Sequence, residues 1–161
     1  MPSVLFVCTA NVCRSPIALG LFKHKIASEP DAALWKLDSA GTWAPEGEPA
    51  STKSQFLLKQ RGIDIQGHRS KSVSLELLRS YNLILTMERG HKEALRSEFP
   101  EIKDRVFMMS EMVGQRHDIQ DPYNGTLDDY NEAFQEIEGI LNLGFEKIRT
   151  LAQDQPAKTG S

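Results

Sequence analysis

The chain has 161 residues, of which 40% are hydrophobic and 25% charged, with a formal net charge of −3 at pH 7. This is typical of one globular domain, and the acidic balance argues against binding to nucleic acid or to anionic lipid. No apolar run approaches the ~20 residues that span a membrane. The first residues have no basic region and only a short apolar run, so we do not expect them to be a secretion signal. Two cysteines make no disulfide framework, so we expect a cytoplasmic protein with neither nucleic-acid nor membrane partners.

Short apolar segments alternate along the chain with longer segments of helical periodicity. Pro16 suits the first position of the first helix and Ser15 its N-cap, while Gly62 and Pro100 end two later helices. In chain order we predict strand 4–7, helix 16–26, strand 35–41, helix 51–61, strand 83–86, helix 88–99, strand 106–109, a turn at 121–125 and helix 127–151.

This alternation of strands and helices predicts βαβ units. We therefore expect an α/β fold in three layers, a four-stranded parallel sheet with helices on both faces. Residues 1–151 form one domain in this interpretation, and the polar residues 152–161 form a disordered tail. Ligands of such sheets bind at the carboxyl ends of the strands, which directs attention to the loop after the first strand.

Residues 8–15, which we call the phosphate loop, read CTANVCRS. A short loop between a strand and a helix turns backbone N–H groups inward and makes a nest for an anion. Arg14 adds a planar fork that binds two phosphate oxygens. The positive charge of Arg14 and the inward N–H groups also favour the thiolate form of Cys8, which is a nucleophile toward phosphorus. Either residue alone would be unremarkable, as a buried apolar cysteine or a surface charge, but the combined pattern indicates phosphate chemistry.

The phosphate loop at residue 8, together with a late Asp121-Pro122-Tyr123, resembles the low-molecular-weight protein tyrosine phosphatases of bacterial type. Further similar blocks follow in the same order, and the resemblance extends over residues 3–151. These blocks are 39–42, 47–49, 62–64, 68–70 and 83–87.

The resemblance implies hydrolysis of aryl phosphates, including phosphotyrosine, through a phosphocysteine intermediate. Cys8 is then the nucleophile, Arg14 binds the phosphate, and Asp121 is the general acid and base, with Asp118 as the nearby alternative. It implies no cofactor and no metal; two cysteines and scattered histidines also lack the spacing of a zinc site. The expected partners are phosphate or other oxyanions and a phosphotyrosine protein such as a bacterial tyrosine kinase, and we expect a monomer.

The resemblance also assigns residues around the reacting groups. Cys13 becomes the redox partner of Cys8, able to form a disulfide under peroxide. Glu88 and Asn82 stand where the family often has Asp, and we expect neither to touch the reacting groups. The residues expected to bind substrate or phosphate are Thr9, Ala10, Asn11, Val12, Cys13, Ser15, Trp43 and Tyr123. Those expected to support the loop are Asn11, Ser15, Ser39 and His68.

Three other functions remain as alternatives on these residues. Arsenate reductases of this fold need a further cysteine pair downstream, and the chain has no cysteine after Cys13. Protein arginine phosphatases carry Thr where this chain has Val12, whose aliphatic side chain suits a flat phenyl ring. A non-catalytic phosphotyrosine-binding module would not need Cys8, Arg14 and Asp121 together.

Overall fold

A four-stranded sheet forms the centre of the computed structural model, which describes residues 1–154. Its strands are β1 (Ser3–Cys8), β2 (Lys36–Gly41), β3 (Leu83–Thr86) and β4 (Val106–Met108). They are all parallel and stand in the order β2-β1-β3-β4. The predicted α/β fold and its parallel sheet are therefore confirmed.

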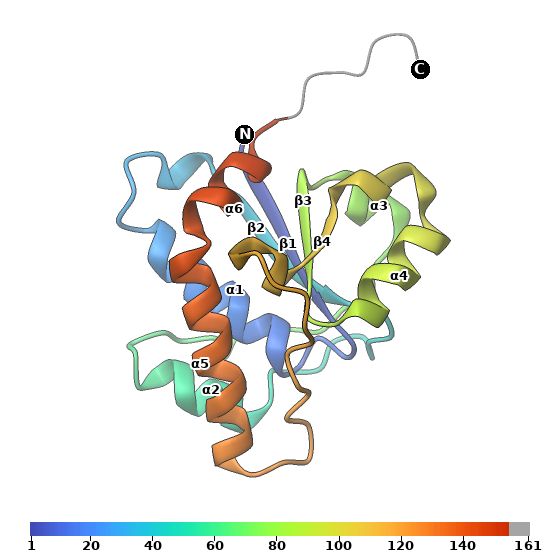
Figure 1. Cartoon of the computed structure of the whole chain (residues 1–161). Helices are drawn as coiled ribbons and strands as arrows, with labels where there is room; N and C mark the ends of the chain where they lie inside the picture. The colour runs from blue at the N-terminus through green and yellow to red at the C-terminus, as the bar shows by residue number, and fades with distance from the viewer. Residues whose placement is uncertain (155–161) are drawn as a thin grey trace, which may run out of the picture.

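Helices cover both faces of this sheet (Figure 1). One face carries α1 (Arg14–Ile26), α5 (Leu127–Leu143) and α6 (Phe145–Ala152), with α2 (Thr52–Lys59) packed on α1 and α5. The other carries α3 (Leu75–Arg79) and α4 (Arg89–Glu98). Three short 3₁₀ helices complete the fold: η1 (Ala32–Leu34), η2 (Pro100–Arg105) and η3 (Met109–Val113).

The apolar core is divided by the sheet into two clusters. Alternate residues of β1 supply the two sides: Phe6 belongs to the cluster under α1 and α5, and Leu5 to the cluster under α3 and α4. Phe22 of α1 packs edge-on against Phe6, with ring centroids 5.7 Å apart. Because β1 is buried along its whole length, its carboxyl end is held firmly beneath the phosphate loop.

The C-terminal helix differs from the prediction of one helix over 127–151. It is divided at Gly144 into α5 and α6. A Cβ atom on Gly144 would lie 2.9 Å from both the carbonyl oxygen and the Cβ of Met112. Close packing of η3 against residue 144 therefore requires glycine. The apolar stripe of α5 continues in α6, so the periodicity of the sequence did not reveal the break between the two helices.

Two local features also differ from the prediction. Helix α1 begins at Arg14 with Cys13 at its N-cap position, so Ser15 lies inside the first turn and is not the cap. Helix α3 was not predicted, because five residues are too few to show a helical period. Its Ser74 N-cap, whose side chain accepts a hydrogen bond from the Leu77 amide, was the available signal.

The two ends of the described chain lie close together (Figure 1). Ala152 is buried and ends α6, and the Asn82 side chain donates to the Ala152 carbonyl and to Asp154 (2.9 and 3.0 Å). Of the tail predicted over 152–161, residues 155–161 lie outside the described residues.

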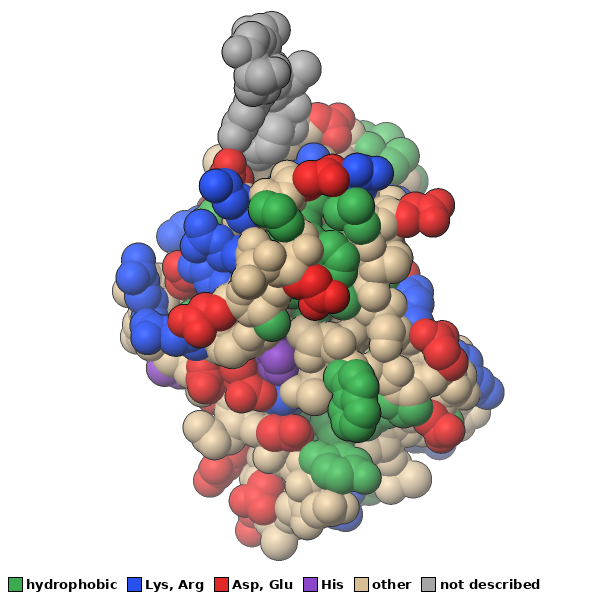
Figure 2. All heavy atoms as spheres, turned by 90° about the vertical axis from the view of Figure 1, so that its right-hand side faces the viewer, with side chains coloured by type: hydrophobic (Ala, Val, Ile, Leu, Met, Phe, Trp, Pro, Cys, Tyr) green, Lys and Arg blue, Asp and Glu red, His purple; other side chains and the backbone are tan. Residues whose placement is uncertain are grey.

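The surface drawn in Figure 2 shows small, separate groups of hydrophobic side chains among acidic and basic ones. Within residues 1–154, no helix combines the length and the apolar character that crossing a membrane requires.

Candidate active site

A cavity of about 700 Å³, here called the phosphate cavity, opens at the carboxyl end of β1. Segments far apart in the sequence meet in its walls: the phosphate loop, the segment after β2, the start of α2 and the turn at 121–123. Its lining residues are Cys8, Thr9, Ala10, Val12, Cys13, Arg14, Trp43, Pro45, Glu48, Pro49, Ala50, Ser51, Thr52, Asp121 and Tyr123.

Asn11 sets the curvature of the phosphate loop. Its φ of 59° is left-handed, a conformation that Asn tolerates better than most residues. Its side-chain amide donates to Ser15 Oγ (2.8 Å) and Ser39 Oγ (2.9 Å), and its carbonyl accepts a hydrogen bond from His68 Nε2 (2.7 Å). The expected supporting residues therefore all contact Asn11, which is fully buried.

The end of β2 approaches the loop closely at Gly41. A Cβ atom there would lie 2.3 Å from the Thr9 carbonyl oxygen, so only glycine fits. The Thr42 and Trp43 amides continue this contact by donating to the carbonyls of Cys8 and Thr9 (2.9 and 3.0 Å). The segment after β2 and the phosphate loop are thus joined through their backbones.

Cys8 ends β1, and its Sγ lies 3.0 Å from Ser15 Oγ. Because Ser15 Oγ already accepts the amide proton of Asn11, its own proton is free to point at the sulfur. Helix α1 begins at Arg14, and its unpaired N-terminal N–H groups face the same region. These donors stabilise negative charge on the sulfur.

Arg14 is buried, with 1% of its surface exposed, and is held from two sides. Its Nη1 donates to the Ile119 carbonyl (2.6 Å) and pairs with Glu88 Oε2 (2.7 Å). Its Nη2 makes no hydrogen bond within residues 1–154 and lies 3.5 Å from Asp121 Oδ2. A buried guanidinium whose Nη2 makes no hydrogen bond, on the wall of a cavity, is suited to bind an oxyanion.

Glu88 was expected not to touch the reacting groups, and this expectation is wrong. It follows β3 and lies at the N-cap of α4, where its side chain accepts from the His91 amide. Because β3 pairs with β1, the carboxylate of Glu88 just after β3 lies against Arg14. The spacing Glu-x-x-His directly after an apolar strand was the signal in the sequence.

His91 links α4 to the phosphate loop. Its Nδ1 accepts the Glu88 amide (3.2 Å), so in the neutral ring Nε2 carries the proton and donates to Thr9 Oγ1 (2.8 Å). Burial, followed by the charge of Arg14, lowers the pKa of His91 below its usual 6.5. Sequence reasoning missed His91 because the contact joins residues 82 positions apart.

The two candidate acids have different surroundings. Asp121 lines the phosphate cavity, and its Oδ1 accepts from the Tyr123 amide (3.0 Å), which fixes the turn. Asp118 Oδ1 instead accepts from the Arg89 amide at the start of α4 (2.7 Å). Only Asp121 therefore has its carboxyl on the wall shared with Cys8.

Cys13 is buried, and its Sγ lies 3.3 Å from the Tyr130 hydroxyl on α5. Burial raises the pKa of the Cys13 thiol. Both cysteines are free thiols in this structure. No group of three or more His, Cys, Asp or Glu side chains within residues 1–154 is arranged to hold a metal ion.

Two aromatic side chains stand at the mouth of the cavity. Trp43 and Tyr123 are 85% and 62% exposed, unlike the buried aromatic residues of the core. Val12 of the phosphate loop also lines the cavity, and its carbonyl accepts from the Ser51 amide at the start of α2 (2.8 Å). The opening is suited to a flat apolar group above a bound anion.

Comparison with known proteins places this geometry in a family. Residues 3–154 match the model of the low molecular weight phosphotyrosine protein phosphatases. A protein-arginine-phosphatase of Geobacillus stearothermophilus is 36% identical over 91% of this chain and 96% of its own. The crystal structure of a low molecular weight protein tyrosine phosphatase from T. tengcongensis is 42% identical, with a TM-score of 0.83 over 91% of this chain and 99% of that one.

A third similar protein, Wzb of Vibrio vulnificus, was solved in complex with benzylphosphonate. It is 29% identical to this chain, with a TM-score of 0.80 over 91% of this chain and 98% of that one. The family model and these similarities extend over nearly the whole domain. The chain belongs to the low molecular weight phosphotyrosine protein phosphatase family, whose members are cysteine-based phosphatases.

Proposed function

We propose that the protein hydrolyses phosphotyrosine and other aryl phosphate monoesters. The observation that carries this proposal is the buried fork of Arg14, whose free Nη2 faces the cavity lined by Cys8 and Asp121. A phosphate bound there has its phosphorus beside the sulfur and its leaving oxygen toward the carboxyl group.

Two displacements at phosphorus make up the reaction. Cys8 thiolate attacks phosphorus, the bond to the phenol oxygen breaks, and the Asp121 carboxyl gives its proton to that oxygen. Water then attacks the phosphocysteine, passing a proton to the Asp121 carboxylate, and the sulfur leaves as thiolate with release of inorganic phosphate. Arg14 and the loop N–H groups stabilise the charge on the equatorial oxygens in both steps.

Phosphoarginine is the second candidate substrate, because a similar protein is named a protein-arginine-phosphatase. Three observations favour the phenyl ring. Trp43 and Tyr123 form apolar walls at the mouth, Val12 has no hydroxyl to assist attack on a phosphoramidate, and a relative binds benzylphosphonate. We therefore propose a phosphotyrosine protein, such as an autophosphorylated bacterial tyrosine kinase, as the partner. A free thiol nucleophile suits a reducing compartment such as the cytoplasm.

Steady-state hydrolysis of p-nitrophenyl phosphate in EDTA, with wild type beside Cys8→Ser, tests the chemistry. We expect turnover by the wild type alone, while the variant still binds vanadate. If the folded and reduced wild type shows no turnover, the proposed hydrolysis is wrong and the phosphate loop is only a binding site. Matched peptides carrying phosphotyrosine or phosphoarginine then test the substrate: a higher kcat/KM on phosphoarginine would make the second candidate correct.

A further inference from the structure

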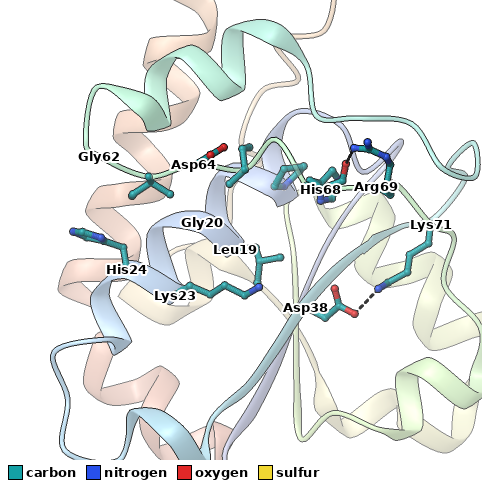
Figure 3. A pocket seen from close by; sticks show the side chains of 14 residues that line it. Leu19, Gly20, Lys23, His24, Asp38, Gly62, Asp64, His68, Arg69 and Lys71 are labelled. Carbon is teal, nitrogen blue, oxygen red and sulfur yellow. Dashed lines mark hydrogen bonds and ion pairs between the residues drawn. The ribbon is translucent and has the colours of Figure 1, made fainter.

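A second cavity, here called the rear cavity, measures about 620 Å³ and shares no lining residue with the phosphate cavity. It lies between α1, β2 and the segment 62–71 (Figure 3). Leu19 of α1 with Ile63 and Ile65 gives it an apolar surface. Its volume falls within the roughly 300–1,000 Å³ of small-molecule sites.

Cationic groups are in excess in this cavity. Lys23, Arg69 and Lys71 line it together with the carboxylates of Asp38 and Asp64. Lys71 forms an ion pair with Asp38, drawn in Figure 3, so these two charges compensate each other. What remains is one carboxylate and two cations around an apolar surface.

Lys23 is the cation that is free to bind. Its ammonium makes no hydrogen bond or ion pair with any other residue of the described chain, and Figure 3 shows it extended from α1 toward β2 and Asp38. Arg69, by contrast, is partly committed, since its Nη1 donates to the carbonyls of Gln66 and His68 (3.1 and 2.7 Å). An anionic group in the cavity would therefore meet Lys23 first.

The wall of the rear cavity is also the support of the phosphate loop. His68 and Lys71 line the cavity, and both hold Asn11: His68 Nε2 donates to its carbonyl, and the Lys71 amide donates to its Oδ1 (3.1 Å). Ser39, the third contact of Asn11, follows the lining residue Asp38. The left-handed residue of the loop thus depends on segments that a ligand in this cavity would touch.

We propose that the rear cavity binds a small organic anion with an apolar ring, and that its occupancy alters turnover at the phosphate loop. The charged group lies against Lys23 and the ring against Leu19, Ile63 and Ile65. Binding shifts the segments that hold Asn11, so the two cavities are coupled, and the coupling acts equally in both directions. The effect on turnover rests on the proposed phosphatase activity, whereas the binding itself does not.

Titration with 8-anilinonaphthalene-1-sulfonate, a fluorescent aromatic sulfonate, tests the binding. The phosphate loop is first saturated with vanadate, so that the sulfonate of the probe cannot bind there, and the Lys23→Glu variant decides whether the remaining binding lies in the rear cavity. We expect one saturable site, weakened about fivefold or more by Lys23→Glu, as loss of a close ion pair predicts. Lys103→Glu on η2, beside the opposite edge of the sheet, is the matched control and keeps wild-type affinity.

Absence of a saturable site in the vanadate-bound protein would overturn the proposal. So would equal affinity of Lys23→Glu and the control, because the probe would then lie elsewhere. Circular dichroism of each variant checks that its fold is retained.

Turnover of p-nitrophenyl phosphate at saturating substrate tests the coupling. We expect the probe to change kcat of the wild type and to change that of Lys23→Glu only at about fivefold higher concentration. Purely competitive inhibition would place the probe in the phosphate cavity, and an unchanged kcat with the probe bound would refute the coupling. If the wild type has no turnover at all, the proposed function fails, while the vanadate titration still decides the binding.

Discussion

The carboxylate of Glu88 lies 2.7 Å from the guanidinium of Arg14, a residue with 1% of its surface exposed. Together with the Ile119 carbonyl it holds Nη1, and this leaves Nη2 turned to the phosphate cavity. The position of the guanidinium is therefore set by two residues outside the phosphate loop, Glu88 after β3 and Ile119 before the turn at 121–123.

Replacement of Glu88 tests this arrangement. Hydrogen bonds to charged groups contribute about 1.5–3 kcal/mol, so Glu88→Ala is expected to lower kcat/KM for p-nitrophenyl phosphate about 10- to 100-fold. Glu88→Gln, which keeps an acceptor, should lose less. Glu93→Gln on the exposed surface of α4 is the control. Wild-type kinetics in a folded Glu88→Ala variant would mean that the Ile119 carbonyl alone orients Arg14.

Substitution of the two candidate acids distinguishes their roles. Asp121→Ala is expected to lower kcat about 10²- to 10⁴-fold, the usual effect of a general acid, and less on substrates with acidic leaving groups. Asp118→Ala removes a hydrogen bond at the start of α4, so we expect near-normal kcat and a free energy of unfolding lower by about 1 kcal/mol. Kinetics with a series of aryl phosphates measure the change in kcat, and urea denaturation measures the change in the free energy of unfolding. The reverse pattern would assign the acid to Asp118.

Much of this site could be predicted because its signals are local. Cys8, Arg14 and the intervening residues lie in one loop after an apolar strand, and the pattern of parallel strands places that loop at the ligand-binding edge. The Asp121-Pro122 turn is likewise a local signal. The positions of β1, β3 and β4 were predicted for the same reason, since each is a short apolar run, whereas β2, with the sequence KLDSAG, was predicted as a strand ending in a Gly turn.

The contacts that were missed depend on the path of the backbone between distant segments. Glu88 meets Arg14 only because β3 pairs with β1, and His91 reaches Thr9 only because α4 begins at that edge. The break at Gly144 similarly reflects the approach of η3, which no period within the helix encodes. The sequence pattern predicts which residues lie at the end of each strand, but it does not predict which of their side chains contact one another.

Oxidation by hydrogen peroxide tests the expected role of Cys13. Peroxide converts the Cys8 thiolate to a sulfenic acid with loss of hydroxide, and the Cys13 thiol then condenses with it, releasing water and forming a disulfide. We expect a reductant to restore wild-type activity after a peroxide pulse and to restore much less in Cys13→Ser. Intact mass identifies the products. Equal recovery by both proteins would show that Cys13 does not protect the nucleophile.

Acid should destabilise the fold through the buried His91 and the half-buried His68. Burial lowers the pKa of His68 and of His91 below 6.5. The unfolded chain therefore binds more protons than the folded chain below pH 6.5, and the free energy of unfolding falls as the pH falls from 6.5 toward the folded-state pKa values. Stability from these residues is fully present above pH 6.5.

Urea midpoints at pH 7.5 and 5.5 measure this loss. His91→Gln can still donate to Thr9 but cannot take up a proton, so the difference between its two midpoints is expected to be smaller than in the wild type. His24→Gln, at an exposed position on α1, is the matched control for the substitution. An equal acid-induced shift in His91→Gln and in the wild type would show that burial of His91 does not make folding sensitive to pH, and would assign the effect to His68.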